Sequence, residues 1–276
     1  MRAYATLVYV FLYAPIGLIV LFSFNAGRHA SDFRGFSTQW YGTAASNPFV
    51  MDALLTSLTV AGTSAVLATL FGTSAALALQ RVRGPLRVIF DALTYIAIMV
   101  PGIVIGIATL VALVTLFGTV NPLLAGLWPE TLGKAPSFGL GYASLIAAHT
   151  LFTMSLVIVI VRARIQGMDR SPIEASADLY ATPFGTFRQV TLPLLFPAVL
   201  AGFLLSFTFS FDDFVIAFFV AGSETTLPIY VFSSIRRGVT PEINAIGSVM
   251  LAVSLMLLVI AQWTIRRRAH ADRAKR

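Results

Sequence analysis

Two adjacent carboxylates are the most distinctive chemical groups of this 276-residue chain, because Asp212 and Asp213 lie inside a long apolar stretch. A carboxylate at the centre of a membrane helix costs about 2.5 to 3.5 kcal/mol on insertion scales, so each should face water, a substrate or another protein group. Consecutive helical residues point about 100° apart. Because both carboxylates cannot then face one narrow pathway, we assign attraction of a cationic group to Asp213 and contacts with neighbouring helices to Asp212.

Asp213 belongs to a stripe of small and polar residues at helical spacing. The stripe comprises Gly202, Ser206, Ser210, Asp213 and Ala217. Such a surface suits either a solvated pathway or close packing between helices. Pro101 interrupts another apolar stretch, where it removes a helical hydrogen bond and predicts a kink. This proline either borders the pathway or is tolerated through its neighbours.

The other reactive residue types predict no catalytic, metal or nucleotide site. The chain has no Cys, and no group of His and carboxylates has the spacing of metal ligands. No Ser, His and Asp residues follow the order of a hydrolase triad. Gly133-Lys134 lacks the leading Gly of a phosphate-binding loop, since position 128 is Trp. His149 stands alone in an apolar stretch, which favours an interhelical hydrogen bond over ligand binding or proton relay. We expect no enzymatic activity and no cofactor bound by this chain.

The elements that must position these residues are membrane helices. The chain is 57% hydrophobic and 11% charged, with a mean hydropathy of +0.84, whereas soluble domains contain roughly 25% charged residues. Its apolar stretches approach or exceed the roughly 20 residues needed to cross a bilayer. They cover residues 7–24, 53–79, 88–117, 141–161, 196–221 and 242–265, which predicts an all-α membrane protein with six transmembrane helices. Thr226-Leu227-Pro228 starts a further short helix, which ends near Gly238 and predicts a re-entrant hairpin.

Basic residues predict the orientation of these helices, because Lys and Arg accumulate in cytoplasmic loops. One side carries only Arg28, Arg34, Lys134, Arg236 and Arg237, whereas every other Lys and Arg lies on the opposite side. Both termini, a loop over residues 162–195 and a basic tail over residues 266–276 are therefore assigned to the cytoplasm. The net charge of +7 reflects this topology, so nucleic acid is not an expected partner, and the tail is free to contact anionic lipid headgroups.

The loop over residues 162–195 has a pattern typical of two short helices. Ser171 to Glu174 has the form of a capping box with Pro172 at the first helical position, and Thr182-Pro183 repeats the cap and the proline. Apolar residues recur there at helical spacing. They are Ile173, Ala177, Tyr180, Ala181 and Phe184. This stripe either docks a partner protein or packs against the chain's own helices.

The same loop resembles the coupling loop of bacterial ABC importer permeases. That loop begins Glu-Ala-Ala, has a Gly four residues after the second Ala, and ends in a hydrophobic-x-Leu-Pro sequence. The matching positions here are Glu174-Ala175-Ser176, Tyr180 and Val190-Thr191-Leu192-Pro193. The resemblance implies docking on a separate ATPase subunit. The residues that match this role are Glu174, Ala175, Ala177, Asp178, Tyr180, Ala181 and Phe184.

Two positions depart from the family pattern, since Ser176 replaces the second Ala and Tyr180 replaces the Gly. A Gly would permit a tight turn, whereas Tyr takes a positive φ only at a cost. We therefore expect the bend between the short helices to be absent, shifted towards Gly185, or different from that of the family.

A closer resemblance, to the spermidine/putrescine branch of these permeases, covers other segments. They are Tyr13–Ile16, Ser23–Asn25, Gly35–Tyr41, Ser206–Asp213 and Val239–Ala245. The resemblance implies a type I permease fold with its core over residues 53–265, preceded by an accessory helix and outer segment over residues 1–52. It also implies a second homologous permease subunit, a cytoplasmic ATPase dimer that uses ATP and Mg, a periplasmic binding protein and a place in the bacterial inner membrane.

The substrate implied by this branch is a polyamine or related amine, with an amino-acid-like compound or another small solute as the alternative. An ion-coupled secondary transporter is a second class of function, in which Asp212, Asp213 and His149 would hold the ion or proton. That reading leaves the loop over residues 162–195 unexplained. A membrane-embedded enzyme is a third class, for which the sequence offers no catalytic residues.

Overall fold

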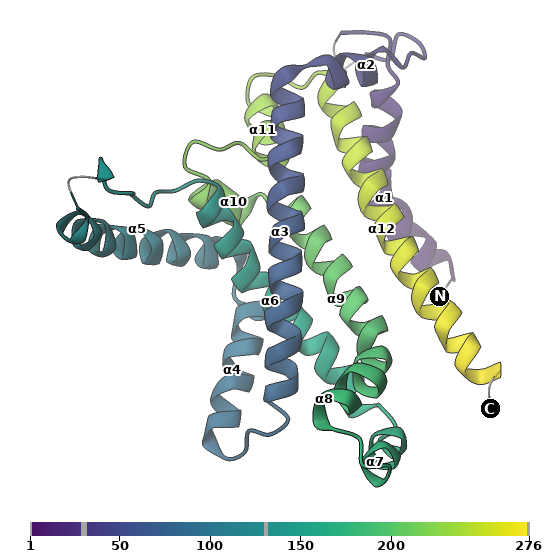
Figure 1. The fold of residues 1–276 in the computed structure, drawn as a ribbon. Coiled ribbons are helices and arrows are strands. Elements are labelled where there is room, and N and C mark those ends of the chain that lie inside the picture. The colour runs from purple at the N-terminus through teal and green to yellow at the C-terminus, as the bar shows by residue number, and fades with distance from the viewer. Residues whose placement is uncertain (1, 29–31, 130–131, 275–276) are drawn as a thin grey trace. The chain divides into compact units, whose positions relative to one another are not determined.

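The computed structural model describes residues 2–28, 32–129 and 132–274 (Figure 1). These residues form helices, apart from loops and one isolated antiparallel bridge between Asn25 and Phe36. Six helices are long and apolar enough to cross a membrane, which confirms the predicted all-α membrane fold. The chain divides into two compact units, residues 1–57 with 225–256 and residues 58–224 with 257–276. The predicted basic tail over residues 266–276 lies outside the residues whose side chains are described.

In the first unit, hydrogen bonds of polar side chains connect helices that are distant in the sequence. Its elements are α1 (Arg2–Ser23), α2 (Gln39–Ser46), the start of α3 (Pro48–Ala78), α11 (Leu227–Ile235) and the start of α12 (Pro241–Ala274). Ser57 Oγ accepts a hydrogen bond from the Leu227 N–H at 2.7 Å, so a residue of α3 satisfies an amide that the first turn of α11 leaves unpaired. Asn47 Nδ2 donates to Glu242 Oε1 at 3.0 Å and so ties α3 to the first turn of α12.

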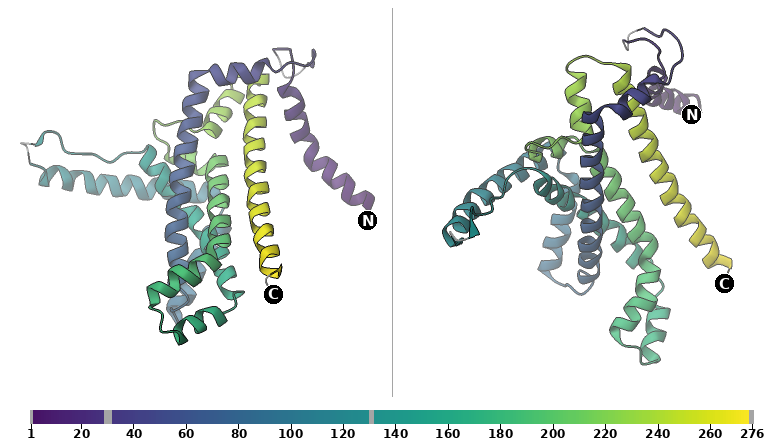
Figure 2. Two further views of the ribbon diagram at one scale, coloured as in Figure 1. Left: turned by 45° about the vertical axis from the view of Figure 1, so that its right-hand side comes forward. Right: turned by 45° about the horizontal axis from the view of Figure 1, so that its top comes forward.

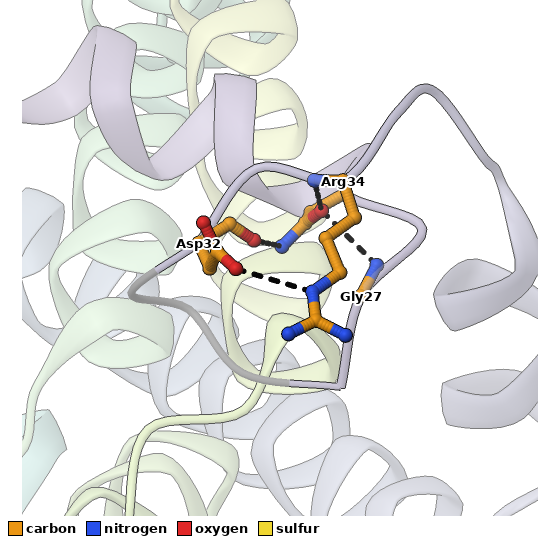
Figure 3. A network of polar contacts seen from close by, with 4 residues as sticks. Gly27, Asp32 and Arg34 are labelled. Atoms are coloured by element: carbon orange, nitrogen blue, oxygen red, sulfur yellow. Dashed lines mark hydrogen bonds and ion pairs between the residues drawn. The ribbon is translucent and has the colours of Figure 1, made fainter.

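Asn25 organises the segment that joins α1 to α2, and Figure 3 labels three residues of this polar network, Gly27, Asp32 and Arg34. Its Oδ1 accepts from the N–H groups of Gly27 and Arg34, and its Nδ2 donates to the Asp32 carbonyl. The Trp40 indole N–H donates to the Asn25 carbonyl at 2.8 Å. Because Asn25 is fully buried, its amide requires the hydrogen-bond partners that these backbone groups supply. The start of α2 is thereby held against the residues that follow α1.

The second unit is built around α6 and α9. Its elements are the remainder of α3, α4 (Pro85–Met99), α5 (Gly102–Leu127), α6 (Tyr142–Gln166), α7 (Ser171–Asp178), α8 (Pro183–Thr186), the π-helical η2 (Phe187–Thr191), α9 (Leu192–Asp212) and α10 (Val215–Val220). A Cβ on Gly72 would lie 2.8 Å from Val157 Cβ, and one on Gly202 would lie 3.3 Å from Val157 Cγ1. The buried Val157 of α6 therefore fills the space that glycines of α3 and α9 leave, which is how small residues bring membrane helices close together.

Two predicted transmembrane helices are interrupted in the structure. We expected a kinked helix over residues 88–117, but α4 ends at Met99 and α5 begins at Gly102, with Val100 and Pro101 extended between them. The proline explains this break, because the residue before a proline disfavours the helical conformation. The predicted helix over residues 196–221 also divides, since α9 ends at Asp212 and α10 begins at Val215.

The two interruptions lie side by side. A Cβ on Gly102 would lie 3.7 Å from Val215 Cγ1, and one on Gly106 would lie 2.7 Å from Phe219 Cδ2. Beyond this contact α5 extends away from α4 and α6 (Figures 1 and 2), and Gly106 is its only buried residue. Most of the apolar surface of α5 is therefore not covered by the described part of this chain.

Candidate functional site

Residues 171–191, which we call the coupling segment, form two short helices and a π-helical turn that leads directly into α9. The predicted cap at Thr182 is confirmed, since its Oγ1 accepts from the Gly185 N–H at 3.1 Å. The predicted capping box of Ser171 and Glu174 is wrong. Ser171 instead donates to Asp169 Oδ1, through its Oγ at 2.6 Å and its N–H at 3.0 Å. Asp169 therefore places a carboxylate at the start of α7, where it is favoured by the helix dipole.

The bend after α7 is made by Tyr180 itself, which has a φ of 55° and is the sole non-Gly residue with positive φ in the described part of the chain. Its N–H donates to the Ala177 carbonyl at 3.0 Å, and the Ala181 N–H donates to the Ser176 carbonyl at 3.1 Å. This pair of bonds defines a Schellman motif, whose left-handed position usually holds Gly. The bend is therefore neither absent nor shifted to Gly185, because two backbone hydrogen bonds fix it at Tyr180 despite the cost of the conformation.

All residues predicted to dock the ATPase are exposed in the structure. They are Glu174, Ala175, Ala177, Asp178, Tyr180, Ala181 and Phe184. The two aromatic side chains are largely uncovered, with exposed fractions of 95% for Tyr180 and 72% for Phe184. Leu179, which is 81% exposed, extends this surface and was absent from the predicted set. The sequence could have indicated Leu179, because it is an apolar residue next to Tyr180.

The predicted apolar stripe divides between two faces of the coupling segment. Ile173, Ala177 and Ala181 line a groove of about 730 Å³ together with the end of α3, where Gln80 and Arg81 border it. Tyr180 and Phe184 do not line this groove. The segment therefore offers an exposed aromatic surface and, separately, an open groove beside α3.

A second polar cluster joins α6 to the break between α9 and α10. His149 Nδ1 lies 2.6 Å from Ser210 Oγ, and His149 Nε2 lies 3.5 Å from Asp213 Oδ2. The same Asp213 oxygen accepts from the Ala217 N–H at 2.9 Å. Asp213 therefore caps the start of α10 and faces a buried imidazole. The interhelical hydrogen bond expected for His149 is present.

Asp212 and Asp213 border one cavity of about 420 Å³, together with Thr208, Phe209 and the residues that follow Asp213. Asp212 is exposed, whereas the Asp213 side chain is only 18% exposed. The other residues predicted on this face, Ser206 and Ser210, are buried in the second unit. Pro101 lies at the neighbouring helix break, immediately before Gly102, which approaches Val215 of α10. The structure thus brings both helix breaks and both carboxylates into one region, although we expected that consecutive helical residues could not share one pathway; the helix ends at Asp212, and Asp213 itself contacts α6 through His149.

The profile of a known family, the binding-protein-dependent transport system inner membrane component, matches residues 68–269. The chain belongs to this family. It is therefore an inner-membrane permease subunit of an ABC importer, which distinguishes it from ion-coupled secondary transporters and from membrane-embedded enzymes. The expected family assignment is confirmed.

Individual relatives agree with the family match. The spermidine/putrescine transport system permease protein PotC of Haemophilus influenzae is 37% identical over 98% of this chain and 97% of its own length. The putrescine transport system permease protein PotI of Escherichia coli K12 is 37% identical over 97% of this chain and 90% of its own length. Among solved structures, a bacterial ABC transporter involved in alginate import has a chain with a TM-score of 0.70 at 16% identity, covering 95% of this chain and 93% of that chain. The last match shows a shared fold.

Proposed function

We propose that this chain is one of two permease subunits of an ATP-driven importer for a polyamine or a related small amine. The observation that carries the proposal is 37% identity along nearly the whole chain to permeases of spermidine/putrescine and putrescine transport systems. The chemistry of the cavity at Asp212 and Asp213 supports it, because amines are cations at neutral pH and two carboxylates border that space. An amino-acid-like solute is the alternative substrate.

The coupling segment is proposed to dock a cytoplasmic ATPase dimer, which would bind the ATP and Mg. The support is an exposed surface that includes Leu179, Tyr180 and Phe184, since large apolar residues gathered on a polar segment typically mark protein contacts. From Pro183 the chain continues as helix to Asp212 over 30 residues, or about 45 Å at 1.5 Å per residue. Movement of the coupling segment would therefore reach the carboxylates through one continuous element.

The translocation pathway is proposed to pass Asp212, Asp213, Ser210 and Ser206, near the helix break at Pro101. In this arrangement the cavity carboxylates meet the cationic groups of the solute, and the contacts of Asp213 with Ala217 and His149 hold its oxygen in place. Broken helices near carboxylates suit such a site, because irregular backbone in a membrane is tolerated where it lines a cavity.

The remaining partners follow from uncovered surfaces and from the distribution of charge. The apolar surfaces of α1 and α5 would be covered by the second permease subunit and by membrane lipid. Both termini and the coupling segment would face the cytoplasm, and a periplasmic binding protein would deliver solute to the opposite side. Residues 53–265 would form the permease core.

The test is reconstitution of the chain with its partner permease and ATPase in proteoliposomes. We expect uptake of radiolabelled putrescine or spermidine that requires ATP, with no ATP hydrolysis by the chain alone. If amino acids inhibited uptake and polyamines did not, the substrate would be an amino-acid-like solute rather than a polyamine. Accumulation by the chain alone, driven by an ion gradient without ATP, would overturn the proposed mechanism.

A further inference from the structure

A small basic cavity lies beside the groove of the coupling segment, with which it shares Gln80. It has a volume of about 130 Å³ and is formed where the ends of α3, α4 and α6 meet the residues before α7. Three guanidinium groups border it, from Arg87, Arg162 and Arg170, together with the amide side chains of Gln80 and Gln166. Every polar side chain around this cavity can donate hydrogen bonds, and none of them is acidic.

The positive charge of the cavity is only partly neutralised by the protein. Asp91 of α4 accepts a hydrogen bond from Arg162 Nη1 and lies 3.8 Å from Arg87 Nε. Arg170 forms no ion pair with any acidic residue in the described part of the chain. The neighbouring Asp169 directs its Oδ1 to Ser171. One carboxylate thus contacts two of the three guanidinium groups, which leaves the cavity with excess positive charge that can attract an anion.

A structural role explains only part of this cluster. The bond between Asp91 and Arg162 joins α4 to α6 and needs one arginine. Arg87 adds an exposed i,i+4 contact along α4, a type worth little to stability. Arg170 takes no part in either contact. Its guanidinium is therefore available to a ligand that also contacts Arg87.

The position of the cavity along the helices indicates which kind of anion can reach it. Arg87 is the third residue of α4, and Arg162 lies four residues before the end of α6 at Gln166, or about 6 Å at 1.5 Å per residue. This end of both helices is the one that the basic residues assign to the cytoplasm. Ile165, which is buried, adds an apolar wall to the cavity. Such a position corresponds to the headgroups of the inner leaflet, which is rich in anionic lipids.

We propose that this cavity binds the phosphate of an anionic phospholipid headgroup. Arg presents a planar fork of donors that matches a phosphate group, and basic pockets between helices on the cytoplasmic side suit such headgroups. The phosphate accepts hydrogen bonds from Arg87 and Arg170, while Arg162 remains paired with Asp91. The site does not depend on the identity of the substrate, but it rests on the cytoplasmic orientation proposed above.

The experiment measures lipid adducts of the full chain in detergent by native mass spectrometry, with phosphatidylglycerol and phosphatidylcholine as probes. The test variant is Arg87→Gln with Arg170→Gln, which keeps the pair of Arg162 and Asp91. The matched control is Arg83→Gln with Arg188→Gln, two exposed residues that lie on the same predicted side and do not line the cavity. We expect the test variant to lose phosphatidylglycerol affinity by roughly thirtyfold, or about fivefold for each arginine, while the control retains it.

Three results would overturn the proposal. Equal loss of phosphatidylglycerol in the test and control variants would show a general charge effect, and equal binding of phosphatidylcholine would show no role for the anion. Displacement of phosphatidylglycerol by inorganic phosphate in millimolar excess would assign the cavity to a free anion of the cytoplasm. If the double variant does not fold, Arg170→Gln alone provides the same comparison against Arg188→Gln, because Arg170 is exposed and outside the long helices.

Discussion

The hydroxyl groups of Ser176 and Thr186 form a hydrogen bond that joins α7 to α8 within the coupling segment. Ser176 stands where the resembling family usually has Ala, so this chain has a polar link that an alanine could not supply. Thr186 also borders the groove beside α3. The two short helices are thereby connected across the bend at Tyr180.

Loss of this hydroxyl pair should loosen the coupling segment without unfolding the membrane helices. We expect Ser176→Ala to lower the free energy of local opening by about 1 kcal/mol, the usual net value of one hydrogen bond. A double-mutant cycle with Thr186→Val, read by amide hydrogen exchange over residues 171–191, measures the interaction. Additive effects of the two changes would show that the hydroxyls do not interact. Ser233→Ala, in the first unit, serves as a control for a serine outside the segment.

The left-handed conformation of Tyr180 predicts an unusual order of substitutions. A non-Gly residue in this conformation costs roughly 1–2 kcal/mol, so Tyr180→Gly should protect the amides of Tyr180 and Ala181 better than the parent, by up to about 1 kcal/mol. Tyr180→Val should open the bend more easily, because a β-branched residue tolerates positive φ poorly. Leu179→Val is the matched control, since Leu179 has a φ of −85°. Equal exchange in all three variants would mean that the bend is not strained.

Much of the membrane fold follows from the sequence, because hydropathy alone fixes where a bilayer requires apolar helices. The sequence predicts a kink at Pro101. That the helix breaks there completely depends on packing of Gly102 and Gly106 against α10. The break at Asp213 had no local signal. It depends on contacts of the carboxylate with the Ala217 amide and with His149, which is distant in the sequence.

The coupling segment shows the same division between local and distant causes. Thr182 caps α8 through a contact with its neighbour Gly185, which a sequence pattern can indicate. Ser171 has an equally good capping pattern, yet its hydroxyl is taken by Asp169. Whether this hydroxyl accepts from an amide of α7 or donates to Asp169 is settled by geometry that a pattern does not contain. For Tyr180 the propensity argument fails, because backbone hydrogen bonds outweigh the preference of the side chain.

A charge placed on the coupling segment should uncouple transport while the chain stays folded. Ala177 is exposed and lines the groove beside α3, apart from the aromatic surface of the segment, so Ala177→Asp tests whether the groove also docks the ATPase, at little cost to the fold. We expect at least about tenfold weaker association with the ATPase, since an unpaired charge at an interface costs 1.4 kcal/mol or more. Gln189→Asp, also exposed but outside the groove, is the control.

Association with the ATPase is measured by co-purification, and folding by thermal unfolding in detergent. Glu174→Ala should have a smaller effect on the same measurements, because the Glu174 side chain makes no cap and is exposed at the first turn of α7. Full association and solute-stimulated ATP hydrolysis in Ala177→Asp would remove the docking role of this face.

Substitution of each of the two cavity carboxylates should have a different effect on uptake and on stability. Asp213→Asn should lower both, because the change weakens the contact with His149 and alters the cap of α10, a contact worth about 1 kcal/mol. Asp212→Asn should lower uptake of a polyamine by about tenfold or more, since a hydrogen bond to a charged group contributes about 1.5–3 kcal/mol, and should lower thermal stability less than Asp213→Asn does, because Asp212 is the more exposed of the two.

Uptake is measured in proteoliposomes with the complete importer, and unfolding with the purified chain. A matched polar change at the same cavity, Thr208→Val, removes a hydroxyl without altering charge, so it should affect uptake less than Asp212→Asn does. Retained uptake in Asp212→Asn would exclude this carboxylate from the cation pathway. If Asp213→Asn lost stability but transported normally once folded, the second carboxylate would be a helix cap alone. In either case the family assignment would stand, because it rests on the whole chain rather than on these two residues.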